Sequence, residues 1–99
     1  MGISFRGHVD FTRDVEWEEI CAACGGSAPR EYTEPRGWTF NFTGSSSYHN
    51  VLEGLKVLGA KGLIEGGRFV SDEDPDSDIL PDGSLCPVVI IRVRLKPPE

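Results

Sequence analysis

Residues 38–62, WTFNFTGSSSYHNVLEGLKVLGAKG, contain the clearest structural pattern in the chain. Aromatic and polar residues alternate from Trp38 to Thr43, which is typical of a strand with one buried face. Gly44 ends that pattern, and the serines after it are suited to cap a helix. The apolar residues that follow would form one face of this helix: Tyr48, Val51, Leu52, Leu55 and Leu58. The stretch therefore predicts a strand followed by an amphipathic helix.

Two glycines interrupt the predicted helix. Gly54 and Gly59 each cost about 1 kcal/mol of helix stability relative to alanine. Close packing of the helix against a sheet would explain why it contains them. Gly62 then ends the helix.

A second strand and helix are predicted near the N-terminus. From Ile3 to Asp10, every second residue is polar, as in a strand with one buried face. Thr12 or Asp14 is suited to cap a following helix, because acidic residues occupy its first turn. One stripe of that helix would hold the apolar side chains Trp17, Ile20, Cys21 and Cys24, and Gly25-Gly26 would end it.

The remaining strands are shorter or less regular. Residues 29–34 predict a short strand, which a tight turn at Glu34–Gly37 joins to the strand that follows. Residues 63–70 flank Gly66-Gly67 and would form a short hairpin or one bent strand. Residues 87–95, PVVIIRVRL, predict a strong strand, and residues 96–99 a flexible tail.

The order of these elements predicts an α+β fold, namely a ferredoxin-like plait (βαββαβ). In this plait an antiparallel sheet carries two helices on one face. Leu63–Val70 would be an extra edge element, and residues 71–85 would be an acidic loop. With 99 residues and 10.9 kDa, the chain is expected to form a single domain over 1–99.

The negative charge lies almost entirely in one segment. The chain has 16 acidic and ten basic residues, a net charge of −6. No basic residue occurs between 72 and 82, whereas six acidic residues do, so the rest of the chain has ten of each sign. The six are Asp72, Glu73, Asp74, Asp76, Asp78 and Asp82. Because Pro75, Pro81 and Gly83 break regular structure, the segment predicts a solvated loop that could dock onto a basic partner.

A polar sheet face would supply a second binding surface. His8 and Asn41 would lie on this face with three outward arginines, Arg6, Arg92 and Arg94. The candidate partner-binding residues are therefore these arginines and the six acids. No catalytic residues, cofactor or metal are predicted, so the expected function is a small acidic non-enzymatic protein-interaction module. By analogy of size and charge, one form is a phage-type inhibitor of a host nucleic-acid-binding or defence complex, with acids that imitate phosphates.

Two resemblances suggest nucleic-acid binding as an alternative. Arg36-Gly37-Trp38-Thr39-Phe40 resembles the RNP1 motif of RNA-recognition domains, which implies that Trp38 and Phe40 stack on bases. The alternation instead favours Trp38, Phe40 and Phe42 in the core, since the residues between them are polar. Tyr48–Ala60 followed by Lys61–Glu65 resembles the end of a winged-helix domain. That fold needs three helices, and the sequence predicts two.

A small zinc protein is the other alternative. Cys21-x-x-Cys24 resembles half of a structural zinc site, which Cys86 and His8 or His49 would have to complete. The sequence contains no second pair of cysteines. Both thiols would lie near the C-terminal end of their helix, on its apolar stripe, which favours a core role over a reactive one.

The sequence also predicts a cytoplasmic protein that does not associate with a membrane. No apolar signal segment follows Met1, and no stretch approaches the roughly 18 apolar residues of a membrane span. Three cysteines are an odd number, which does not suit a disulfide-stapled secreted domain. A protein with a basic surface is the expected partner, and a homodimer could form because exposed edge strands can pair.

Overall fold

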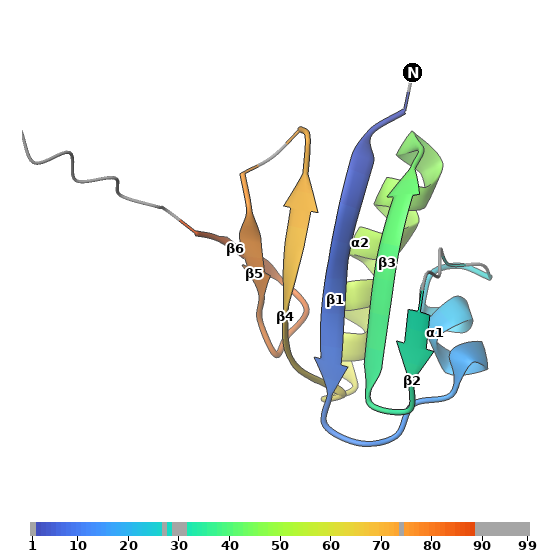
Figure 1. The fold of residues 1–99 in the computed structure, drawn as a ribbon. Helices are drawn as coiled ribbons and strands as arrows, with labels where there is room; N and C mark the ends of the chain where they lie inside the picture. The colour runs from blue at the N-terminus through green and yellow to red at the C-terminus, as the bar shows by residue number, and fades with distance from the viewer. Residues whose placement is uncertain (1, 27, 29–31, 74, 89–99) are drawn as a thin grey trace, which may run out of the picture.

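The computed structural model describes residues 2–26, 28, 32–73 and 75–88, which form one antiparallel sheet and two helices (Figure 1). The elements follow in the order β1 (Ser4–Phe11), α1 (Trp17–Ala23), β2 (Tyr32–Glu34), β3 (Gly37–Thr43), α2 (Ser45–Ala60), β4 (Ile64–Ser71), β5 (Ser77–Ile79) and β6 (Leu85–Pro87). The six strands are arranged β2-β3-β1-β4-β5-β6, and all neighbours are antiparallel. The predicted α+β class is confirmed.

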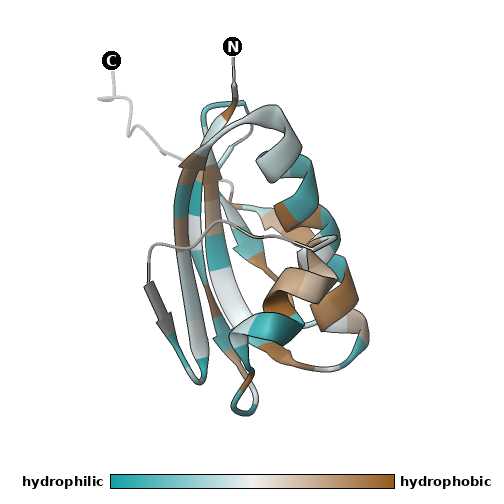
Figure 2. Cartoon of the chain, turned by 90° about the vertical axis from the view of Figure 1, so that its right-hand side faces the viewer, coloured by the Kyte–Doolittle hydropathy of each residue, from teal (hydrophilic) through white to brown (hydrophobic). Residues whose placement is uncertain are grey.

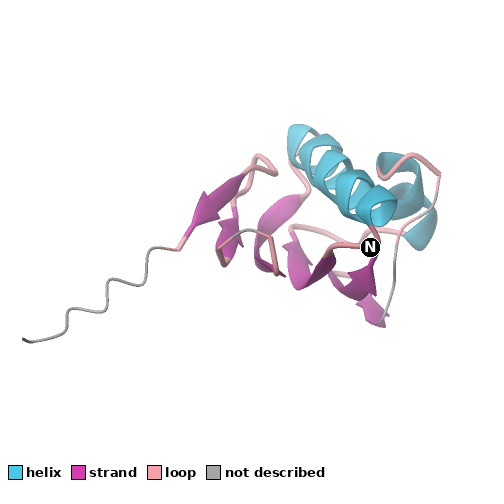
Figure 3. Cartoon of the chain, turned by 90° about the horizontal axis from the view of Figure 1, so that it is seen from above, coloured by secondary structure: helices cyan, strands magenta, loops and turns pink. Residues whose placement is uncertain are grey.

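Both helices lie on the same face of the sheet (Figures 2 and 3). Strand β1 is flanked on both sides, so its inward side chains Phe5, Val9 and Phe11 are buried. Aromatic rings from the neighbouring strands surround them: the Phe5 and Phe69 rings stack at 5.9 Å, and the Trp38 and Phe40 rings lie 4.8 Å apart. The opposite face of the sheet carries no helix.

The two glycines of α2 mark close contacts, but neither contact is with the sheet. A Cβ atom on Gly54 would fall on the Sγ atom of Cys24, the residue that ends α1. A Cβ atom on Gly59 would fall on the backbone of Asp82 and Gly83, in the β5–β6 turn. The prediction of packing against a sheet was therefore wrong. The glycines let α1 and this turn approach the helix backbone.

The prediction that Leu63–Val70 is an extra edge element was also wrong. This stretch forms β4, which lies between β1 and β5 in the interior of the sheet. Gly66 and Gly67 lie within the strand rather than in a turn. The strand contains glycine at position 67 because a Cβ atom there would fall on the carbonyl oxygen of His8 in β1.

The prediction that 71–85 forms one continuous loop was wrong. Residues 77–79 form β5, where Ser77 and Ile79 are buried, so only 72–76 and 80–84 connect strands. The predicted strand 87–95 and tail 96–99 fall mostly outside the described residues, as do residues 29–31 of the predicted strand 29–34. Neither helix in the described part of the chain is long and apolar enough to cross a membrane.

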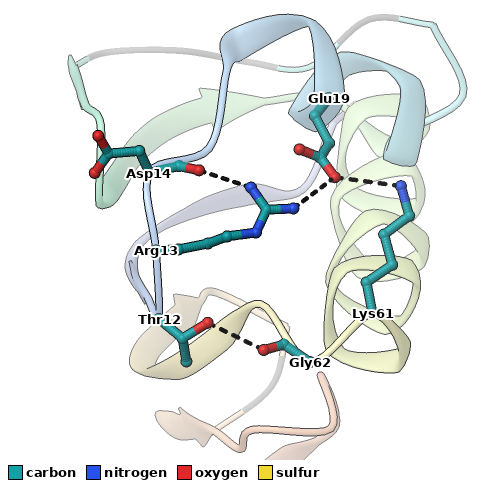
Figure 4. Close-up of polar contacts among 6 residues, drawn as sticks. All are labelled: Thr12, Arg13, Asp14, Glu19, Lys61 and Gly62. Atoms are coloured by element: carbon teal, nitrogen blue, oxygen red, sulfur yellow. Dashed lines mark hydrogen bonds and ion pairs between the residues drawn. The ribbon is translucent and has the colours of Figure 1, made fainter.

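Polar contacts fasten the β1–α1 loop to the end of α2 (Figure 4). The hydroxyl of Thr12 donates to the carbonyl oxygen of Gly62 at 3.0 Å. Glu19 lies 3.6 Å from Arg13 and 3.5 Å from Lys61, so one carboxylate bridges the loop and α2. Helix α1 begins after Glu16, and no side chain caps it, so the predicted caps at Thr12 and Asp14 were wrong.

Candidate interaction surface

The six acids of the 72–82 segment do not form one cluster. Asp72, Glu73 and Asp76 lie in the β4–β5 connection, whereas Asp82 lies in the β5–β6 turn. Since β4 and β5 are antiparallel, these two connections lie at opposite ends of the strands (Figure 1). Asp78 lies between them in β5, and Asp74 falls outside the described residues.

Three of these acids make intramolecular contacts. The Asp72 carboxylate accepts the backbone N–H of Ser4 at 3.2 and 3.3 Å, which fastens the end of β4 to β1. Asp78 lies 3.1 Å from Arg68 on the neighbouring strand. In the β5–β6 turn, Asp82 Oδ1 accepts the Ser84 hydroxyl at 2.6 Å and the Ser84 backbone N–H at 2.9 Å.

The turn at Asp82 therefore has a structural role. Hydrogen bonds from the Ser84 hydroxyl and backbone N–H favour the ionised carboxylate and lower the pKa of Asp82. The same turn packs against Gly59 at the C-terminal end of α2. Its carboxylate thus holds the turn in place as well as carrying charge.

The acids of the β4–β5 connection face the solvent, and Asp72 also accepts the Ser4 N–H. Asp72 and Glu73 are exposed, and Asp76 is half-buried. Among the described residues, no ion pair involves any of these three carboxylates. We call Asp72, Glu73 and Asp76 the acidic end of the sheet; within the described part of the chain, no basic side chain is paired with its negative charge.

The uncovered face of the sheet, which we call the open face, is polar. Arg6 and His8 of β1 and Asn41 of β3 are exposed there, where the alternation predicted them. The side chains enclose a shallow groove of about 380 Å³, lined by Arg6, Gly7, His8, Thr39, Phe40, Asn41, Arg68 and Val70. A second depression of about 310 Å³ adjoins it, lined by Ser4, Phe5, Arg6, Asn41, Val70, Ser71 and Asp72.

Arg68 belongs to this face and was not among the predicted site residues. It pairs with His8 across the β1–β4 ladder and contacts Asp78 on its other side. The alternation Arg68-Phe69-Val70 carries the signal, because Phe69 is buried and its neighbours face the solvent. Arg92 and Arg94, which were predicted on this face, lie outside the described residues.

The aromatic residues of the RNP1-like motif cannot stack on bases in this structure. Trp38 is 1% exposed and Phe40 is 0% exposed, so both belong to the core as the alternation predicted. Phe42 is 45% exposed, and its predicted burial was wrong. It faces the same side of the sheet as Phe5, its partner across the β1–β3 ladder, but lies next to the end of β3.

The structure does not bring the three cysteines together. Cys24 is buried against Gly54, and burial, helped by the neighbouring Cys21, raises its pKa to about 12. Cys86 is exposed on β6, at the edge of the sheet far from α1 (Figure 1). The residues that the structure describes include no group of three or more His, Cys, Asp or Glu side chains that could hold a metal ion.

Comparison with known proteins assigns no family to the chain. No family model, curated protein or solved structure matches it. The chemistry of its two exposed surfaces, the acidic end and the open face, therefore carries the argument about function.

Proposed function

We propose that the protein is a small acidic, non-enzymatic protein-interaction module that docks onto a basic partner surface. The acidic end, formed by Asp72, Glu73 and Asp76, would make the contact. The observation that carries this proposal is the absence of a compensating ion pair at these carboxylates among the described residues. Uncompensated charges at one end of a molecule attract a partner of opposite charge and raise its association rate.

We also propose that the fold is a ferredoxin-like plait, which the order of its strands and helices along the chain supports. Elements β1 to β4 follow the sequence strand–helix–strand–strand–helix–strand of a ferredoxin-like plait. In this description β4 is the fourth strand of the plait, and the β5–β6 hairpin is added at its edge. The connection from β4 to this hairpin then carries Asp72, Glu73 and Asp76.

The most specific form of the proposed function is inhibition of a nucleic-acid-binding protein in the cytoplasm, such as a host defence complex met by a phage. Carboxylates spaced along a connection can imitate the phosphates of a nucleic acid. Such an inhibitor would compete with DNA or RNA for a basic channel. Arginines of the open face, with Arg6 among them, would contact acidic residues at the rim of that channel.

The test compares two variants that have the same net charge. In one, D72N/E73Q/D76N neutralises the acidic end and keeps an oxygen that can accept the Ser4 N–H. In the other, E18Q/E53Q/E65Q neutralises three exposed acids on α1, α2 and β4. Each variant and the wild type would serve as bait for affinity capture from host lysate, at low and at high salt.

At low salt we expect the wild type and the helix-and-strand variant to capture the same partner, and the acidic-end variant to lose most of it. High salt should release the partner from all three baits, because screening weakens exposed charge pairs. Equal capture by the two variants would contradict docking through the acidic end. Equal retention at both salt concentrations would contradict the electrostatic mechanism.

A further inference from the structure

Two opposite charges share one depression on the open face. Arg6 of β1 and Asp72, which follows β4, both line the depression of about 310 Å³. Both residues are exposed, and among the described residues neither forms an ion pair. The hydrogen bonds from the Ser4 N–H hold the Asp72 carboxylate at this position.

A guanidinium group and a carboxylate that line the same depression without forming an ion pair can each bind a second molecule. Arginine binds carboxylates through two parallel hydrogen bonds, so the Arg6 side chain is suited to a carboxylate from outside. Asp72 is equally suited to an incoming guanidinium group. A surface that carries both groups side by side is complementary to itself.

We propose that two copies of the chain associate through their open faces about a two-fold axis, with Arg6 of each copy paired to Asp72 of the other. In a two-fold interface, if a first residue contacts a second across the interface, the second contacts the first in return. One rotation axis midway between the two side chains therefore forms both ion pairs at once. The proposal needs no other protein, so it does not rest on the proposed function.

The rest of the depression suits such a contact. Asn41 and Ser71 provide groups that donate and accept hydrogen bonds, and Val70 adds a small apolar side chain. The net charge of −6 on each copy opposes association. At physiological ionic strength, however, charges more than about 8 Å apart are largely screened, whereas contacting pairs are screened less.

Sedimentation analysis of the purified protein, over a range of concentrations near physiological salt, tests the proposal with two charge-reversal variants. In homodimers of R6D, two aspartates would face each other at each contact, and in homodimers of D72R two arginines would do so. We expect each variant to dimerise at least tenfold more weakly than the wild type. An equimolar mixture should recover the dimer, because the heterodimer has opposite charges at both contacts.

Several results would overturn the proposal. They are a wild type that stays monomeric throughout, charge-reversal variants that dimerise as well as the wild type, and a mixture that fails to recover the dimer. A monomeric wild type would leave the open face to a different protein. If D72R unfolds by circular dichroism, D72N and R6Q remove the pair more gently and should still weaken the dimer. Sedimentation of the purified protein measures self-association with no partner present, whereas affinity capture measures partner binding, so the two proposals can fail separately.

Discussion

Cys24 and Gly54 meet where α1 packs against α2, and the contact is close enough to test by substitution. Gly54→Ala would by itself favour the helix by about 1 kcal/mol. The added methyl group would fall on Cys24 Sγ, and overpacking of this kind costs about 1–3 kcal/mol. We expect G54A to lower the free energy of unfolding, measured by urea denaturation.

The matched comparison is the same substitution in a Cys24→Ala background, where the Sγ atom is gone. There, G54A should cost less than in the wild type, with a coupling of at least about 0.5 kcal/mol between the two sites. If G54A costs the same in both backgrounds, the contact with Cys24 is not what requires glycine.

The thiol of Cys24 should be chemically inert in the folded protein. Burial, with Cys21 close by, raises its pKa to about 12, so almost no reactive thiolate exists near pH 8. Iodoacetamide at that pH should modify the exposed Cys86 first and Cys24 only after unfolding, as measured by peptide mass mapping. Modification of Cys24 at the rate of Cys86 would contradict its burial.

The same shift predicts a dependence of stability on alkaline pH. The folded pKa lies above the ordinary value of 9.0, so the contribution of the thiol is complete below pH 9 and is lost as pH rises towards 12. The unfolding free energy of the wild type should therefore fall more steeply over this range than that of Cys24→Ala. Parallel pH profiles for the two proteins would count against the shift.

The β5–β6 turn provides a test at the scale of an element. Ser84→Ala removes the hydroxyl that donates to Asp82, so the pKa of Asp82 should rise towards its ordinary value. Because this pKa is lowered in the folded state, Asp82 stabilises the turn above its ordinary pKa, and the effect is lost as pH falls through the folded pKa. Carboxyl carbon shifts followed by NMR during acid titration would measure the change. Ser46→Ala, an exposed serine on α2, is the control and should leave the pKa of Asp82 as it is.

Elements with a regular hydrophobic period were predicted well. The alternation of β3 and the apolar stripe of α2 predicted both elements and most of their buried residues. The place of β4 inside the sheet could not be predicted, because Gly66-Gly67 lowers the strand propensity of this stretch. Glycine is needed at position 67 because the backbone of β1 passes close to it, and the sequence of β4 does not show this contact. The exposure of Phe42 could not be predicted either, because the alternation gives only the face to which it points and not how well the end of β3 is covered.

At the scale of the whole molecule, the acidic residues of 72–82 were predicted to form one surface, but the fold separates those that the structure describes. The strand β5 places Asp82 at the opposite end of the hairpin from Asp72, and a short segment rich in proline and aspartate gives no signal for such a strand. Arg6, His8 and Asn41 were predicted on one face because strand alternation alone decides it. Arg68 joins them only through the pairing of β4 with β1.

The burial of Trp38 decides between a core and a base-stacking role, and its consequence concerns the stability of the whole domain. Trp38→Ala would leave a cavity in the core, next to the ring of Trp17 in α1, at a cost of about 3–5 kcal/mol. Domains of this kind have total stabilities of about 5–15 kcal/mol, so this loss is a large fraction of the whole. We expect a much lower urea midpoint for W38A, measured by circular dichroism, and a smaller decrease for Phe42→Ala, whose ring is partly exposed. A W38A variant as stable as the wild type would place Trp38 outside the core and restore the RNA-recognition hypothesis, and a gel shift with short RNA would then test it.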